Sequence, residues 1–484
     1  MEPNDHLYVH DTERSPLLQK THAETTTEYV SSKGWKKEAL IIVQGSAPLA
    51  VALVLQYALT ASSIVVLGHL GNREVGAVSL ANMTACITGT CVYQGFASSL
   101  DTLCPQAYGS GKKTLVGLHL QRMTIMLLLM TIPIGILWLN SDAIFSCILR
   151  KEDAETAHLA GLYLKILLAG APGYACFEAG KRFVQAQGLF SPILLVLLIC
   201  TVFNISMSWL LVWKLRWGFI GAPISVAISM NLLPMLLALY VYAVQGSECW
   251  QPISSAAWNG WGPMLRLAIP SWLIMEAEFA TWEIMTLASS YLGSKSLAGQ
   301  SGVVTITSFA FYIGYSVAVA GGTRVSQLVG AGFLAEARIA TRVSFIVAFF
   351  TSVVTVALLM CLRNVVSNLF STDKDVVRLI SSILPLCAVE LVLDSLVSCL
   401  AGVLRAIGRP SLGTYVQIPV YYAMAIPLSF VIAFHLHWGI MGIWTGLLVG
   451  QFVLVTVEGA LLWYMLDWEK AAMDASIRNM SAWT

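Results

Sequence analysis

The sequence predicts an all-α membrane protein in which twelve helices form two parallel six-helix repeats. Of its residues, 57% are hydrophobic and only 11% are charged, whereas soluble domains carry about 25% charged residues. Twelve apolar stretches are each long enough to cross a bilayer, which takes about 20 residues. The third observation is an internal repeat with an offset near 221 residues. A repeat of this length in so apolar a chain is typical of transporters built from two bundles.

The apolar stretches run near residues 39–66, 75–99, 115–139, 157–179, 191–213 and 219–244, and then near 264–291, 302–322, 341–362, 376–404, 411–434 and 439–466. We interpret them as helices, because every backbone N–H and C=O group in lipid needs a hydrogen-bond partner within the protein. An even number of helices puts both ends of each half on one side of the membrane. The halves are therefore expected to be related by a two-fold axis along the membrane normal.

This spacing divides the chain into five parts. We expect residues 1–36 to be a disordered cytoplasmic tail, 37–244 the amino-terminal bundle, 245–262 a linker, 263–466 the carboxyl-terminal bundle and 467–484 a second cytoplasmic tail. Lys and Arg are somewhat more frequent on the side of the chain ends, which predicts that both termini are cytoplasmic. Glu13, Leu17 and Leu18 resemble a dileucine sorting signal; chance apolar residues in a tail are the alternative. The plasma membrane and the vacuolar membrane therefore both remain open.

The repeat duplicates turn residues. The paired positions are Pro48 and Pro270, Gln106 and Gln327, and Gly109 and Gly330. The glycine-rich stretches lack the Gly-Lys-Ser/Thr ending and the preceding strand of a phosphate loop. We interpret them as tight turns between helices with a gating or structural role.

Composition excludes several classes of function. The net charge is +1, and no basic cluster with interleaved aromatics appears, so we expect no nucleic-acid partner. The ten cysteines are scattered and contain no Cys-x-x-Cys pair, which predicts neither a disulfide framework nor a metal site. No catalytic constellation is visible in a loop, so we expect no enzyme activity and no cofactor. The expected partners are the lipid bilayer and small organic molecules, and we expect a monomer.

Carboxylates inside the apolar stretches carry the functional signal. The seventh stretch holds Glu276, Glu278 and Glu283, and the tenth holds Glu390 and Asp394, whose spacing of four puts both on one helix face. A charged side chain at a helix centre costs about 2.5–3.5 kcal/mol on insertion scales. Burial and like-charged neighbours stabilise the protonated form, so such acids are able to load and unload a proton. The alternative is a structural role for a permanently protonated acid.

Spacing within the seventh stretch leaves the functional pair open. Glu276 and Glu283 are seven apart and share a face, whereas Glu278 and Glu283 are five apart and lie about 140° apart on an ideal helix. Asp101, at the end of the second stretch, fits a capping or gating motif better than a proton route. Glu178 precedes Lys181 and Arg182, which predicts an ion pair near a helix end. Lys165 and Glu458 have no explanation at this stage.

Several motifs resemble the multidrug and toxic compound extrusion (MATE) family in its eukaryotic branch. The first helix around Gln56 and Tyr57, the Ser79–Asn82 segment and the Ser99–Gly109 segment match its opening pattern, second helix and first gate. The segment from Gly322 to Gly332 resembles the mirrored motif after the eighth helix. The resemblance covers residues 38–466 and implies a V-shaped arrangement of the two bundles. It also implies that Gln56, Tyr57 and Asn82 face a central cavity.

The resemblance further implies a cation site in the carboxyl-terminal half at Glu278, Glu283 and Asp394, with Glu390 beside them. Two departures stand out: Phe279, Ala280 and Thr281 replace bulkier aromatics of plant relatives, and the first helix lacks the acid of bacterial relatives. The function implied is export of organic, cationic or amphipathic compounds in exchange for protons by rocking of the bundles. A sodium-coupled exporter of the same fold, a major-facilitator transporter, a lipid flippase and, least of all, a membrane enzyme are the rivals.

Turns are duplicated in the repeat, but charge is not. Subtracting 221 from Glu278, Glu283, Glu390 and Asp394 gives Tyr57, Ser62, Ala169 and Gly173. We therefore expect the proton chemistry in the carboxyl-terminal half.

Overall fold

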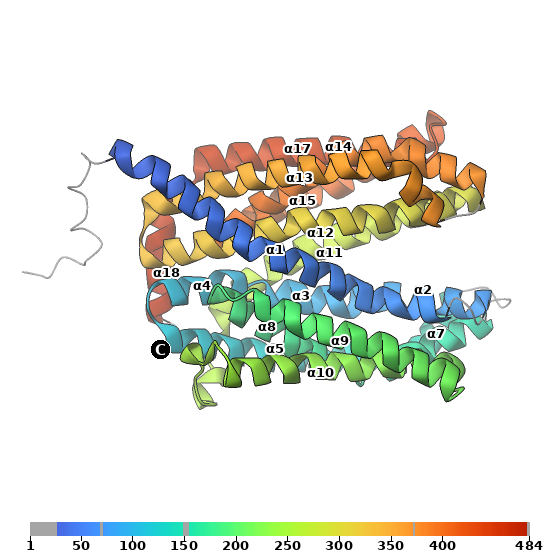
Figure 1. The fold of residues 1–484 in the computed structure, drawn as a ribbon, viewed down its shortest axis with the longest axis horizontal. Coiled ribbons are helices and arrows are strands. Elements are labelled where there is room, and N and C mark those ends of the chain that lie inside the picture. The colour runs from blue at the N-terminus through green and yellow to red at the C-terminus, as the bar shows by residue number, and fades with distance from the viewer. Residues whose placement is uncertain (1–26, 68–70, 149–153, 371–372, 482–484) are drawn as a thin grey trace, which may run out of the picture.

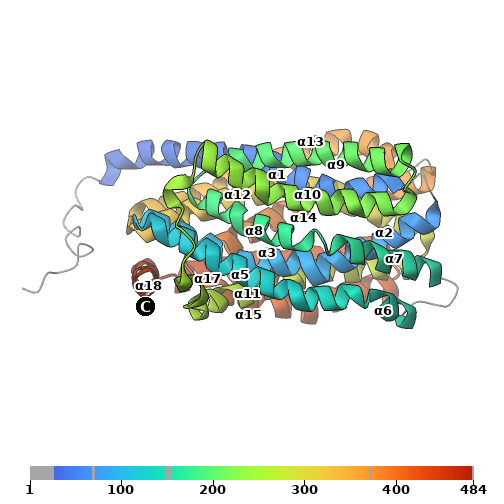
Figure 2. The ribbon, with the colours of Figure 1, turned by 90° about the horizontal axis from the view of Figure 1, so that it is seen from below.

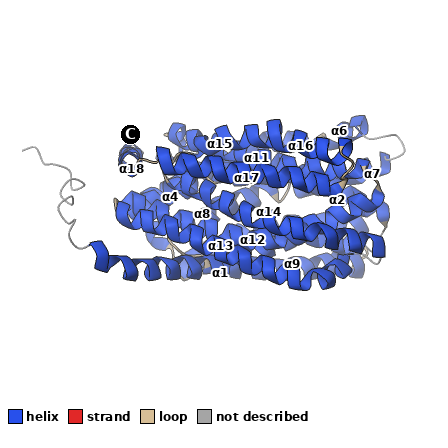
Figure 3. Cartoon of the chain, turned by 90° about the horizontal axis from the view of Figure 1, so that it is seen from above, coloured by secondary structure: helices blue, strands red, loops and turns tan. Residues whose placement is uncertain are grey.

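The computed structural model describes residues 27–67, 71–148, 154–370 and 373–481, and within these ranges it holds helices and no strands (Figure 3). The amino-terminal half contains α1 (Thr27–Leu67), α2 (Asn72–Ala85), α3 (Cys91–Ala97), α4 (Leu100–Gly109), α5 (Lys113–Leu139), α6 (Ser141–Ile148), α7 (Ala154–Leu167), α8 (Ala171–Ala186), α9 (Ser191–Trp209) and α10 (Gly221–Ala243). The carboxyl-terminal half contains α11 (Trp261–Tyr291), α12 (Ser294–Ala331), α13 (Leu334–Phe370), α14 (Lys374–Ala406), α15 (Pro410–Pro419), α16 (Ile426–Phe430), α17 (Ile440–Met465) and α18 (Trp468–Ser481).

The twelve predicted spans are all present, although two of them depart from a plain apolar helix. Ten helical spans in the described ranges are long and apolar enough to cross a membrane, and α7 with α8 forms one further span bent by 56°. The bend falls at Gly170 and Pro172, where the proline removes a backbone donor. α11 is long enough to cross a membrane, but any 18 consecutive residues in it include at least three charged ones. Apolarity alone therefore does not identify α11 as a membrane span.

The backbone confirms the internal repeat. Gly111 and Gly332 have φ of 79° and 76°, and Gly188 and Gly408 have φ of 78° and 76°. Gly218 and Gly439 form a third pair, with φ of 59° and 57°. Side chains rarely adopt this left-handed region, so glycine recurs because the same turn recurs.

The two halves form two layers of long helices (Figure 1). The amino-terminal half, blue to green, lies below the carboxyl-terminal half, yellow to red, and the view from below shows the same helices running along the long axis (Figure 2). α1 crosses between the layers, packs on both α9 and α12, and carries Glu38 to an ion pair with Arg324 at 2.7 Å. Many outward-facing side chains are apolar, such as Ile132 and Phe350, which are 60% and 63% exposed, as expected for a surface in contact with lipid.

Each half has its own core. One large cluster fills the amino-terminal half and includes Tyr93, Tyr163 and Phe177, and a second cluster in the other half surrounds the fully buried Trp444. Between the halves, the segment after α10 is held on α5, where the Gln121 amide donates to the backbone oxygens of Gln251 at 2.7 Å and Pro252 at 3.1 Å.

Both chain ends differ from the sequence-based expectation. The predicted tail 1–36 is helical from Thr27, and the dileucine-like segment lies outside the described residues. The predicted tail 467–484 contains α18, whose Ala471, Ala475 and Asn479 are buried. α18 lies across the end of both layers, at the left in Figure 1. We call this end of the molecule the α18 face; α4 and α12 also end there.

Candidate functional site

Three carboxyl groups gather in the carboxyl-terminal half. Asp394 and Glu390 of α14 are 5% and 1% exposed, and the Asp394 carboxyl interacts electrostatically with those of Glu390 and of Glu278 on α11. The Gln451 amide of α17 donates to Asp394 Oδ1 at 3.1 Å and lies 3.5 Å from the Tyr421 hydroxyl. Glu390 Oε1 makes no hydrogen bond to the described residues. With so few donors, negative charges on the two buried acids Glu390 and Asp394 would be poorly compensated, so this cluster is suited to holding protons.

The other two acids of α11 do not join this cluster. Glu283 is half-buried, and no charged group of the described residues acts on it appreciably. Of the site implied at Glu278, Glu283 and Asp394, the structure therefore brings together Glu278 and Asp394 but not Glu283, because the spacing of five turns Glu283 away from the face that Glu278 presents to α14. Glu276 interacts instead with Trp272, one turn earlier on the same helix.

Two groups that the sequence left unassigned lie beside the cluster. Arg405, near the end of α14, interacts electrostatically with Glu278. Glu458 of α17 is 1% exposed and interacts with Arg405 as well. Their position near the cluster depends on which faces three helices turn to one another, and spacing within one helix does not reveal that.

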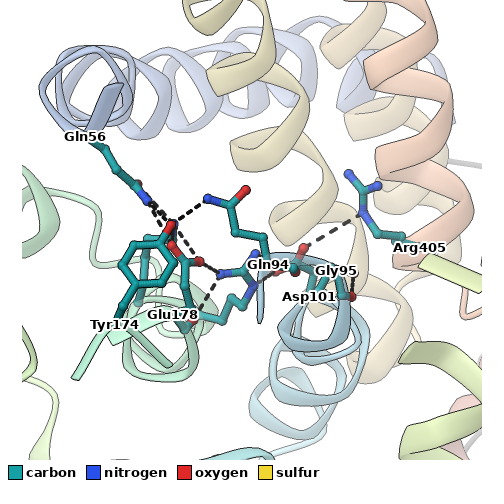
Figure 4. Close-up of polar contacts among 10 residues, drawn as sticks. Gln56, Gln94, Gly95, Asp101, Tyr174, Glu178 and Arg405 are labelled. Carbon is teal, nitrogen blue, oxygen red and sulfur yellow. Dashed lines mark hydrogen bonds and ion pairs between the residues drawn. The ribbon is translucent and has the colours of Figure 1, made fainter. Parts of the chain in front are cut away.

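The amino-terminal half holds a buried charge network of its own (Figure 4). Glu178 of α8 is fully buried, pairs with Arg182, and accepts from Lys181 Nζ at 2.9 Å. Arg182 Nε lies 3.7 Å from Asp101 Oδ1, and Asp101 Oδ2 lies 3.8 Å from Arg405 Nε. The predicted Glu178 ion pair is confirmed, but it is buried and part of a network. Charge is therefore present in both halves, although the acids of this half are paired with cations.

The three residues expected at a central cavity have different surroundings. Gln56 belongs to the network in Figure 4: its Nε2 donates to Glu178 Oε1 at 2.9 Å and to the Tyr174 hydroxyl at 3.0 Å. Tyr57 packs against the rings of Phe309 and Tyr312 on α12, with centroids 5.3 and 5.7 Å apart. Asn82 Nδ2 is 3.5 Å from Ser63 Oγ within the amino-terminal half. Only Tyr57 of the three thus contacts the opposite bundle.

The repeated glutamines join the halves in a reciprocal way. Gln106 Nε2 donates to the backbone oxygen of Ala406 at 2.8 Å, and Gln327 Nε2 donates to that of Ala186 at 2.9 Å. The donors are 221 residues apart and the acceptors 220, so each half gives the other the same bond. We call these four residues the clasp.

The repeated glycines permit the close approach beside the clasp. A Cβ on Gly109 would lie 1.9 Å from the backbone oxygen of Gln327, and one on Gly330 would lie 2.2 Å from that of Gln106. Pro48 and Pro270, by contrast, lie inside the long helices α1 and α11, away from the clasp in sequence.

Comparison with known proteins places this pair of repeats in a family. The model of the MatE family matches the chain twice, over residues 48–210 and 270–431. The chain belongs to the MatE family. An uncharacterized transporter of Schizosaccharomyces pombe is 36% identical to this MATE transporter, with 91% of this chain and 82% of that protein covered. Mouse "Multidrug and toxin extrusion protein 2" is 30% identical over 92% of this chain and 77% of its own length.

The crystal structure of the eukaryotic MATE transporter AtDTX14 has the same fold, with a TM-score of 0.87 at 30% identity, covering 92% of this chain and all of that one. The resemblance to the eukaryotic branch and the all-α twelve-helix fold are thereby confirmed. The present protein is a polytopic membrane transporter, which agrees with the expectation of no enzyme activity.

In this MATE transporter, α18 adds a second layer of contacts over the clasp. Arg478 Nη2 donates to Gln106 Oε1 at 3.0 Å, and Asn479 Nδ2 donates to the Gln106 backbone oxygen at 3.3 Å and to Ser110 Oγ at 3.2 Å. From the amino-terminal half, Lys112 Nζ reaches the Asn479 backbone oxygen at 3.1 Å. The carboxyl-terminal helix thus binds the amino-terminal bundle and holds the α18 face closed.

The remaining unexplained cation also has a partner. Lys165 of α7 pairs with Asp142 of α6, at the end of the molecule opposite the α18 face. An ion pair, and not snorkelling alone, accounts for it.

Proposed function

We propose that this MATE transporter is a proton-driven antiporter that exports organic cationic or amphipathic compounds by rocking of its two bundles. The observation that carries the proposal is the cluster of Glu278, Glu390 and Asp394, in which Glu390 and Asp394 are buried, Glu278 is half-buried and hydrogen-bond donors are few. A carboxyl cluster of this kind binds either protons or a cationic group. The two ligands therefore compete for the same charges.

Competition of this kind is sufficient for exchange. A ligand shifts a conformational equilibrium only by its different affinity for the two states. In the proposed cycle, protons load the cluster from the side opposite the α18 face and weaken the hold on the organic cation, which leaves. The bundles then rock, the α18 face opens, the protons leave, and the ionised cluster admits the next cation.

The clasp supports the direction of this cycle. Its reciprocal bonds, together with the contacts of α18, join the bundles at the α18 face, so the state described is taken as the one open to the opposite side. We propose that the α18 face is cytoplasmic, in keeping with the Lys and Arg bias, in the plasma membrane or the vacuolar membrane. A monomer without a cofactor suffices for this cycle.

The proton rather than sodium is the proposed coupling ion. Glu390 and Asp394 are buried with few hydrogen-bond donors, and a bound proton neutralises each carboxyl directly. The substrate class rests on the acidic cluster and on the name of the mouse relative, which refers to drugs and toxins.

The test is transport by purified protein in liposomes. Tetraethylammonium movement is measured under an imposed proton gradient and, separately, under a sodium gradient. We expect the proton gradient alone to drive transport in the wild type. Asp394→Asn should abolish this drive, while Glu336→Gln, which changes an exposed carboxylate on α13, should leave it unchanged. Transport driven by sodium and indifferent to pH would refute the proposal.

A further inference from the structure

Glu458 is a buried carboxyl that the proposed cycle does not yet use. It lies in the half of α17 nearer the α18 face, seven residues before the helix ends at Met465. Its side chain is 1% exposed, and neither of its carboxyl oxygens makes a hydrogen bond to the described residues. An ionised carboxylate in such a place is costly unless a cation or a donor compensates it.

The groups around Glu458 come from three elements packed on α17. α15 contributes Gln417, which interacts electrostatically while its Nε2 stays without a hydrogen bond, and Gly413, where a Cβ would lie 3.7 Å from Glu458 Oε1. The π-helical segment Val420–Ala425, which follows α15, contributes Tyr421, a buried phenol. α14 contributes Arg405, the charged group of the described residues that acts on Glu458 electrostatically.

Tyr421 links Glu458 to the carboxyl cluster. Its phenol interacts electrostatically with Glu278, Asp394, Glu390 and Glu458 alike, and it lies 3.5 Å from the Gln451 amide that binds Asp394. The four acids thus all lie within electrostatic range of one hydroxyl, and Glu458 lies nearer than Gln451 to the end of α17 at the α18 face. A proton that leaves Asp394 toward this face has Glu458 as the next carboxyl.

Arg405 is shared between the two bundles. In the state described, its Nε lies 3.8 Å from Asp101 Oδ2 of the amino-terminal bundle (Figure 4). Its backbone oxygen accepts from the Thr102 hydroxyl. Glu278 and Glu458, its other electrostatic partners, belong to the same bundle as Arg405. When the bundles separate at the α18 face, Asp101 moves away with its bundle, and these two carboxyls remain.

We propose that Glu458 is a proton-binding site between the carboxyl cluster and the α18 face, and that Arg405 discharges it when the α18 face opens. While the face is closed, Arg405 is engaged with Asp101 and Glu458 keeps its proton. Opening removes Asp101, Arg405 then stabilises the Glu458 carboxylate, and the Glu458 proton passes to water at the opened face. Asp394 next gives its proton to the Glu458 carboxylate by way of Tyr421, so that one proton leaves and one is replaced.

This inference rests on the proposed proton coupling, and the experiment separates the two. Wild-type protein, Glu458→Gln and the control Glu336→Gln are reconstituted in liposomes that contain a pH-sensitive dye. Proton movement is recorded on addition of tetraethylammonium, and exchange of labelled for unlabelled tetraethylammonium at equal pH is measured in parallel. We expect Glu458→Gln to lose at least about tenfold in proton-coupled transport, with exchange retained, because exchange needs no proton release. The control should match the wild type in both assays.

The outcomes are distinguishable. Wild-type transport without proton movement refutes the proposed function itself. Proton-coupled transport by Glu458→Gln at the wild-type rate and with the wild-type pH profile overturns the role of Glu458 alone. If Glu458→Gln fails to fold, Arg405→Gln keeps the carboxyl and removes the cation, and it must then show the same selective loss of proton release. Arg405→Lys should restore part of it, and a wild-type proton flux in Arg405→Gln would overturn the inference.

Discussion

The glycine contacts beside the clasp allow a steric test of how the α18 face closes. We expect Gly109→Ala and Gly330→Ala to force the bundles apart at this face. The added Cβ of Gly109→Ala would lie 1.9 Å from a backbone oxygen of the other bundle, about 1.5 Å short of the 3.4 Å at which ordinary contact begins. The atom it meets belongs to a helix backbone, so no flexible side chain can turn away.

The magnitude follows from the cost of overpacking. Overpacked sites lose about 1–3 kcal/mol, which lowers the population of the closed α18 face by about 5- to 150-fold relative to open states. Alanine otherwise stabilises a helix by about 1 kcal/mol relative to glycine. A loss of the closed population therefore has to come from the contact between the bundles.

Distances between spin labels give the measurement. Thr114→Cys and Ala335→Cys place labels at exposed positions of the two bundles on the α18 face, and electron paramagnetic resonance in nanodiscs reports their separation. We expect a growing long-distance population for both glycine variants. Gly459→Ala, where the added Cβ meets nothing within 4 Å, is the matched control. Distance distributions that are identical in all variants, with unchanged thermal stability, would refute the reasoning.

Three further predictions concern the charges and the carboxyl-terminal helix. Glu178→Gln leaves two buried cations without their carboxylate, so we expect a loss of about 3–5 kcal/mol in the free energy of unfolding and a lower thermal unfolding midpoint; an unchanged midpoint contradicts this. Asn479→Ala removes two hydrogen bonds from α18 to the amino-terminal bundle, each contributing about 0.5–1.5 kcal/mol, and should raise the long-distance population of the spin labels. If this population stays at the wild-type level, α18 does not hold the face. Asp101→Asn weakens the ion pair with Arg405 and should open the same face. The double variant Asp101→Arg with Arg405→Asp exchanges the two charges and should restore closure; if it stays open, Arg405 is not the partner of Asp101 that closes the face.

The sequence is sufficient for the architecture because its signals are local. Long apolar runs predict the helices, and the paired residues Gly109 and Gly330 predict the repeat, which the similar positive φ values of Gly188 and Gly408 confirm. Even α11, with three acids, is predicted correctly, because its apolar residues continue on either side of them.

The candidate site is predicted only in part because its geometry is not local. A spacing of four correctly pairs Glu390 and Asp394, whereas a shared face within α11 favours Glu276 over Glu278. The structure selects Glu278, since helix-to-helix facing decides which acid meets α14. Arg405 and Glu458 are missed for the same reason: one lies near a helix end and the other on a helix without a second acid.

The clasp is made twice from one sequence motif, and the symmetry of the repeat decides where both copies lie. An axis along the membrane normal turns one copy into the other without exchanging the two faces of the membrane. Closure at the opposite end must therefore come from residues outside the clasp. Each end of the transporter then has its own seal, so substitutions in the clasp are able to change the lifetime of one open state without affecting the other.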